Sequence, residues 1–273
     1  MKAMELKKTF LKYFKIFLHL QKIGLMSRTA YRANFFIIIF AVLIQASFSL
    51  IFIKVVFGFL NNISGWNYYE ALVIVATYLI VEGLMWVLFG QFNTIVKQIQ
   101  QGELDGLIVR PIDTQFLVSV WRGDSEDIVR IITGLGVIVY ALNNLNLTLT
   151  QITVNSFFYI FMLFNALVIT YSLAVLFKTI SIWTIEARAF FHLTDSFSRM
   201  SQYPTDIFYH KIVQTIATVI IPLFFMATVP AKILTRGFDL KIVLSSFIIA
   251  GVFFYISRKF FQFALTKYES ASS

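Results

Sequence analysis

The chain has 273 residues, of which 58% are hydrophobic and 14% are charged, and its formal net charge is +9. Its mean hydropathy is +0.77, whereas a typical soluble domain is about 45–50% apolar and about 25% charged. The composition therefore predicts an integral membrane protein and leaves no room for a large soluble domain. The sequence contains no cysteine, which excludes disulfides, thiolate zinc sites and cysteine nucleophiles.

Most of the net positive charge lies in residues 1–34, which contain eight basic residues and one acidic residue. Apolar residues recur opposite the basic ones at helical spacing: Leu6, Phe10, Phe14, Phe17 and Leu18. The pattern predicts a basic amphipathic helix at an anionic cytoplasmic membrane surface, although a cluster that only sets topology fits as well. Membrane lipids rather than nucleic acid are the expected partner, because the basic residues stop where the membrane begins. No cleaved signal peptide is expected, since the apolar run starts only near Asn34.

Hydropathy predicts an all-α protein with about six membrane-spanning helices, because each needs about 20 apolar residues to cross the bilayer. Five of them are expected near residues 35–57, 69–90, 129–148, 154–177 and 240–260. The first and third connections carry no charge, whereas the loop at residues 91–130 contains Lys97, Arg110, Arg122 and Arg130. By the positive-inside rule, this loop and both termini are predicted to be cytoplasmic in a cell-membrane protein.

The fifth span has two candidate positions. Residues 180–199 contain Glu186, Arg188, His192 and Asp195, which are costly in lipid unless they face protein or water. Residues 212–230 are more apolar but carry Pro222 in the middle of the run. The charge count favours residues 212–230, because the other choice leaves more basic residues on the outer side.

The loop at residues 91–130 is the most distinctive segment. Its apolar residues, Ile95, Ile99, Leu104, Leu107 and Ile108, give a short amphipathic helix. Gly102 and Gly106 interrupt this helix, and Arg110-Pro111 ends it, because the residue before proline is pushed out of the helical region. Such a helix can dock in a groove of another protein or can be a solvated connector, and the pattern alone does not distinguish the two.

Catalytic motifs are absent from the sequence. It has no phosphate-binding G-x-x-x-x-G-K-[ST] loop, so any ATP hydrolysis must come from a partner chain. The three scattered histidines do not make a metal site, and no cofactor is expected in this chain. Glu82 lies in the second span, where it is either a proton relay or substrate contact or a glutamate that packs between helices.

Four segments, in order along the chain, resemble ABC type-2 exporter permeases. Residues 102–113 read GELDGLIVRPID, which is similar to the G-x-L-x-x-L-L-x-R-P pattern of that family's cytoplasmic loop. The other three are residues 30–35 before the first span, the proline-containing stretch at residues 203–231, and the ending at residues 267–273. The resemblance therefore covers nearly the whole chain and implies a transmembrane domain over residues 35–273.

The resemblance implies a non-catalytic permease that pairs with a second, identical or sister permease and with two cassette ATPases that bind ATP and magnesium. The loop after the second span would hold the coupling helix that enters a groove on the ATPase. Its counterparts here are Gln98, Gly102, Glu103, Leu104, Gly106, Leu107, Ile108, Arg110 and Pro111, with Arg122, Asp124 and Asp127 behind them. Leu104, Leu107 and Ile108 are expected to face the partner, and Asp113 is expected to lie in water.

The same resemblance implies short re-entrant helices over residues 203–236 and a fifth span at residues 180–199, against the charge count. The translocation path would then include Glu82, Glu186, Arg188 and His192. The substrate would be a drug-like, lipid-like or other amphiphile. Two other classes fit the residues alone: a proton-coupled secondary transporter that uses Glu82, and a membrane scaffold or channel subunit.

Overall fold

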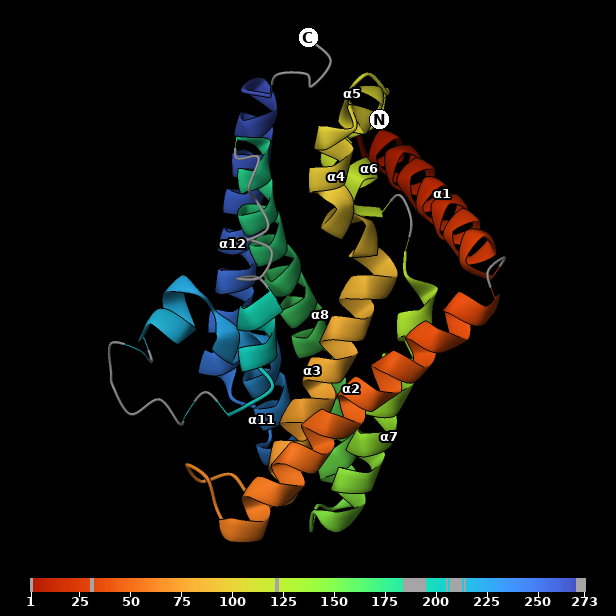
Figure 1. The fold of residues 1–273 in the computed structure, drawn as a ribbon. Coiled ribbons are helices and arrows are strands. Elements are labelled where there is room, and N and C mark those ends of the chain that lie inside the picture. The colour runs from red at the N-terminus through yellow and green to blue at the C-terminus, as the bar shows by residue number, and fades with distance from the viewer. Residues whose placement is uncertain are drawn as a thin grey trace.

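The computed structural model describes residues 2–29, 32–120, 123–183, 195–204, 206, 213 and 215–268. This part of the chain is an array of helices and contains no β-strand (Figure 1). Four described helices are long and apolar enough to cross a membrane. They are α2 (Arg32–Phe59), α3 (Tyr68–Phe89), α8 (Leu149–Thr179) and α12 (Leu240–Thr266). The predicted all-α membrane class is thus confirmed for the described residues.

Helix α7 (Ile128–Asn144) runs antiparallel to α3 along its length. The ring of Tyr140 lies 6.2 Å from that of Tyr69 at one end of the pair. Near the middle, a Cβ added to Gly134 would lie only 2.8 Å from the carbonyl oxygen of Ala76. Small residues let membrane helices approach this closely. The α3–α7 pair forms much of the core, and residues 71–76 of α3 are all buried.

Arg236, the last residue of α11 (Val229–Arg236), connects several segments at one end of the bundle. Its guanidinium pairs with Glu70 at 2.9 Å and lies 4.1 Å from the ring centroid of Trp66. It also donates a 2.7 Å hydrogen bond to the carbonyl of Gly65. The Trp66 indole N–H donates to Asp206 at 2.8 Å. The connection between α2 and α3, the end of α11 and Asp206 therefore lie together at this end.

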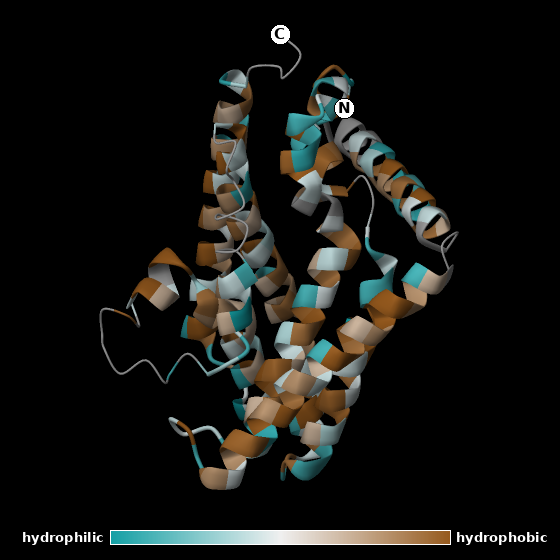
Figure 2. Ribbon diagram, viewed as in Figure 1, coloured by the Kyte–Doolittle hydropathy of each residue, from teal (hydrophilic) through white to brown (hydrophobic). Residues whose placement is uncertain are grey.

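The opposite end carries three short helices, α4 (Ile95–Gln100), α5 (Glu103–Ile108) and α6 (Thr114–Val120). The start of α1 (Lys2–Thr29) and the last turns of α12 lie at the same end (Figure 1). Figure 2 shows hydrophobic residues along α2, α3 and α7, with hydrophilic residues concentrated around α4 and α5. These short helices belong to the predicted loop at residues 91–130. This loop therefore projects from the apolar bundle.

Trp183 and Asp206 lie at opposite ends of the bundle. The ring of Trp183 lies 5.6 Å from that of Phe260 and 6.2 Å from that of Phe263, near the end of α12. Asp206, in contrast, bonds to Trp66 at the other end. Residues 184–194 lie outside the described residues, so Glu186, Arg188 and His192 have no structural account.

Residues 215–236 do not form one continuous helix. Two π-helical turns, Ile216–Ile220 and Phe224–Thr228, are separated by Ile221, whose φ of −125° and ψ of 89° are not helical. Pro222 follows directly, and proline cannot supply the N–H of a continuing helix. Over its described part, the apolar run at residues 212–230 is therefore broken, in contrast to a single straight span.

Helix α1 has two apolar faces rather than one. Phe17 is half-buried, and with Leu20 it packs against Leu117 and Val120 of α6. Phe10 and Phe14, predicted on the same stripe as Phe17, are 69% and 48% exposed. The predicted stripe is thus divided, because one side of α1 covers α6 and the other faces outward.

Candidate functional site

Helix α5 is anchored inside the protein by two leucines. Leu104 is fully buried and Leu107 is 6% exposed. Both belong to an apolar cluster whose other buried members are Phe92, Ile95, Val118, Val175 of α8 and Phe261 of α12. The expectation that Leu104 and Leu107 face a partner is therefore wrong. The segment does have an apolar side, as the amphipathic pattern predicted, but this side packs on this chain's own helices.

The outer surface of this segment is a compact tip, which we call the docking tip. It consists of the exposed residues Gln101, Glu103, Gly106, Ile108, Val109, Arg110 and Pro111. Val109 is 82% exposed and Ile108 is 38% exposed. Val109 was not named among the predicted coupling residues, although it lies within the predicted helix. Its signal is an apolar residue directly before Arg110-Pro111, where the chain turns.

Some of the remaining predicted coupling residues lie in the protein interior and others lie on its surface. Gln98 is buried at 3% exposure, so it supports the segment from within. Gly102 lies between α4 and α5 with a φ of +70°, a left-handed conformation that glycine adopts without strain. Arg110 donates a 3.2 Å hydrogen bond from Nε to the carbonyl of Gly106, which closes the turn after α5. Arg122, predicted behind the loop, lies outside the described residues.

Asp113 connects the end of this segment to α12. Both of its carboxylate oxygens accept hydrogen bonds from Arg258, one of them at 2.8 Å. The same guanidinium donates to Gln115 at 3.0 Å, and the backbone N–H of Asp113 donates to Tyr13 at 3.2 Å. The expectation that Asp113 lies free in water is wrong, because a residue 145 positions away neutralises it.

The pKa of Asp113 is lowered from its ordinary value. Burial alone would raise this pKa, but the hydrogen bonds from Arg258 and from the backbone N–H of Phe116 outweigh it. A carboxylate with a depressed folded-state pKa stabilises the protein above its unfolded pKa, near 3.8. That stabilisation is lost as the pH falls through the lower, folded value.

We therefore expect Asp113→Asn to lower the unfolding temperature of the purified protein at pH 6–8. Both partners of the ion pair are about one-third exposed, so solvent screening limits the shift to about 1–4 °C. Thermal unfolding from pH 8 to pH 3 checks this, with Glu103→Gln on the exposed side of α5 as the control. The gap between wild type and Asp113→Asn should narrow below about pH 4. A gap that stays constant down to pH 3 would contradict the assignment.

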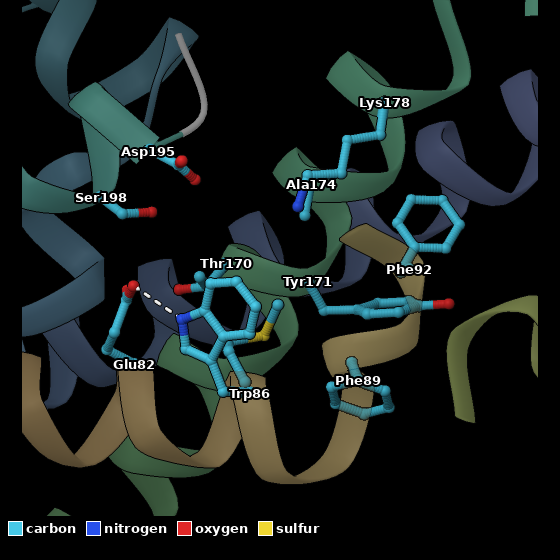
Figure 3. A pocket seen from close by; sticks show the side chains of 11 residues that line it. Glu82, Trp86, Phe89, Phe92, Thr170, Tyr171, Ala174, Lys178, Asp195 and Ser198 are labelled. Carbon is cyan, nitrogen blue, oxygen red and sulfur yellow. Dashed lines mark hydrogen bonds between the residues drawn. The ribbon is translucent and has the colours of Figure 1, made fainter. Parts of the chain in front are cut away.

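A second group of polar residues lines a pocket inside the bundle (Figure 3). Glu82 accepts a 3.2 Å hydrogen bond from the indole N–H of Trp86, one turn along α3. Lys178, 5% exposed near the end of α8, and Asp195 line the same pocket. Lys178 was not singled out from the sequence, because it directly follows the apolar run of its span. The pocket brings acidic and basic side chains from three segments together within the bundle.

Asp127 and Arg130, counted as loop residues from the sequence, form a buried ion pair of 2.9 Å at the start of α7. Because the two side chains neutralise each other, both charges can be buried at the start of α7, next to the membrane. No cluster of three or more histidine, aspartate or glutamate residues that could hold a metal ion occurs in the described part of the chain.

The comparison with protein families agrees with this architecture. A family model described as ABC-2 family transporter protein matches residues 43–272. The chain belongs to the ABC-2 family of transporter proteins. It is therefore a multi-pass membrane permease of an ABC transporter, a transport subunit that is not itself catalytic, and the family implies association with an ATP-binding-cassette ATPase. No match is found among curated proteins or among solved structures.

Proposed function

We propose that this permease exports an amphiphile and that its docking tip binds the cassette ATPase that powers transport. The observation that carries the proposal is the surface of the tip. Apolar Ile108 and Val109 are exposed next to charged Glu103 and Arg110, at a protein end rather than on the membrane-facing flank (Figure 1). Exposed apolar residues rimmed by polar ones are typical of protein interfaces.

The anchors below the tip explain how such docking would act on the membrane helices. Leu104 and Leu107 pack with Val175 of α8 and Phe261 of α12. Asp113 is ion-paired with Arg258, also on α12. Because protein cores are densely packed and transmit displacement, a movement imposed on the tip would be carried to α8 and α12.

The proposed topology has six spans, with the tip and both termini in the cytoplasm. The fifth span would be residues 180–199, and residues 203–236, which include the broken segment at residues 215–236, would be the re-entrant part at the outer end. Its support is the Arg236–Glu70 pair, which joins α11 to the start of α3 at the end opposite the docking tip. The basic helix α1 would lie along the cytoplasmic membrane surface through exposed Phe10 and Phe14.

The polar pocket around Glu82 would be part of the translocation path. It is the part that lies within the described residues. A second permease would complete this path, and two ATPases would bind below, one at each tip. Substrate and ATP must each favour a different arrangement of the dimer, since a ligand shifts an equilibrium only through differential affinity. A proton-coupled transporter that uses Glu82 would need no ATPase, so the docking test separates the two functions.

Val109→Asp is expected to abolish association with the ATPase without unfolding the permease. The substitution places a carboxylate into an apolar contact, which costs several kcal/mol, or about a hundredfold or more in affinity. Val109 is 82% exposed, so the isolated permease should fold as before. Co-purification of the tagged permease with its cassette ATPase, together with vesicle transport, measures the loss.

Leu60→Asp is the matched control. Leu60 is 50% exposed in the connection at the opposite end of the bundle, so the same change of charge there should leave ATPase binding intact. Undiminished association and transport by Val109→Asp would show that the docking tip is not the ATPase site. Transport that needs no ATPase would support the Glu82 alternative.

A further inference from the structure

A pocket of about 540 Å³ opens between α1, α6, α8 and α12, away from the docking tip. It adjoins the pocket around Glu82, with which it shares Phe89 and Tyr171. Its volume is in the range of about 300–1,000 Å³ that is usual for small-molecule sites. The chain's own helices do not fill it. The pocket therefore has room for a ligand, and its lining indicates which kind.

The lining is polar at one end and apolar at the other. Asp113, Gln115 and Arg258 form the polar end with Tyr13. Phe164 and Leu167 of α8 and Phe254 of α12 are among the residues that line the apolar end. An occupant that satisfies both ends has a polar head and an apolar tail.

The two ends lie at different depths in the membrane. Arg258 is 18 residues after the first residue of α12, or about 27 Å along a helix that rises 1.5 Å per residue. The hydrocarbon layer is about 30 Å thick, so Arg258 lies close to the membrane surface on the docking-tip side. Phe254 of the apolar end lies four residues before Arg258 on α12, or about 6 Å further from that surface. The apolar end therefore lies deeper in the same leaflet.

The apolar end opens toward the surrounding lipid. Phe164 is 61% exposed and Phe254 is 46% exposed, although both lie in apolar helices that can cross a membrane. Large aromatic side chains on such helices contact acyl chains rather than water. The pocket is thus accessible sideways from the leaflet.

We propose that this pocket binds one phospholipid of the leaflet on the docking-tip side. An acyl chain would lie between α8 and α12 against Phe164, Leu167 and Phe254, and the phosphate would lie beside Tyr13 and Arg258. Lys12, the exposed neighbour of Tyr13 on α1, favours an anionic head group at this end. The lipid would thus contact the residues that connect the docking tip to α12. The proposal requires only that the chain spans a membrane and is independent of ATPase docking.

Photolabelling of the wild-type protein tests the site without any mutation. The permease, alone or with its ATPase, is placed in nanodiscs that contain phosphatidylglycerol with a diazirine in one acyl chain. After irradiation, mass spectrometry locates the labelled residues. Labels should concentrate at residues 164–168 and around Phe254. Labels spread evenly over the exposed residues of α8 and α12, including Ile160 and Ile248, would overturn the proposal.

A pocket-filling variant provides the second readout. Leu167→Trp should fill the apolar end and reduce the phospholipid retained in native mass spectrometry by about tenfold. Ile160→Trp is the control, because Ile160 is 65% exposed on the same helix but does not line the pocket. Equal retention by the two variants would contradict the site. If Leu167→Trp does not fold, the wild-type labelling pattern decides the question.

Discussion

Leu107→Asp is expected to prevent stable folding of the permease, whereas Val109→Asp, two residues further on, is expected to remove only ATPase binding. Leu107 is 6% exposed in the cluster that joins α5 to α8 and α12. Truncating a buried leucine costs about 2–5 kcal/mol, and burying an unpaired carboxylate adds to that cost. Total stability is only about 5–15 kcal/mol, so the variant should yield little monodisperse protein.

Size-exclusion chromatography and protease resistance of the detergent-solubilised protein measure this loss. Leu107→Met is the matched control, since a volume-conserving apolar exchange costs less than about 1.5 kcal/mol. The opposite outcome would be a Leu107→Asp protein that folds normally and lacks only the ATPase. That result would mean that Leu107 faces the partner and that the internal packing of α5 is wrong.

The second large effect is expected at the crossing of α3 and α7. Gly134→Val should destabilise the permease by about 1–3 kcal/mol, the usual cost of overpacking. A Cβ at Gly134 would lie 2.8 Å from the carbonyl of Ala76 and 2.7 Å from Cγ1 of Ile80. The backbone carbonyl cannot rotate away as a side chain could, so α7 would have to move off α3.

Gly136→Val, in the same helix, is the control that distinguishes the effect of packing on stability from the effect of helix propensity. A Cβ at Gly136 meets nothing within 4 Å, and the change in propensity from glycine to valine is the same at both positions. The difference between the two unfolding temperatures therefore reports the α3–α7 contact. Equal unfolding temperatures would contradict the close approach of the two helices.

The local sequence pattern was sufficient to predict part of the candidate site. The sequence located the hydrophilic segment between the second and third spans, its break at Gly102 and its end at Arg110-Pro111, all of which α4 and α5 reproduce. It could not tell which side of α5 contacts a partner. An amphipathic period shows that a helix has an apolar face, but not whether this chain or another protein covers that face.

Contacts between distant residues were likewise beyond the sequence. Asp113 and Arg258 are 145 positions apart, and no spacing rule joins them. For the fifth span, hydropathy and the charge count favoured residues 212–230, whereas the resemblance implied residues 180–199, of which 184–194 lie outside the described residues. The contacts of Trp183 with α12 and of Asp206 with Trp66 lie at opposite ends of the bundle.

The sequence by itself determined the membrane class and the positions of the helices α2, α3, α7, α8 and α12. These properties depend on composition and on runs of apolar residues, both of which are local. Only the tertiary structure decided that Leu104 and Leu107 are internal anchors, that Val109 lies on the surface and that Asp113 pairs with Arg258. The physical reason is that burial and ion pairing depend on which helices pack together, and that packing is set by the whole bundle.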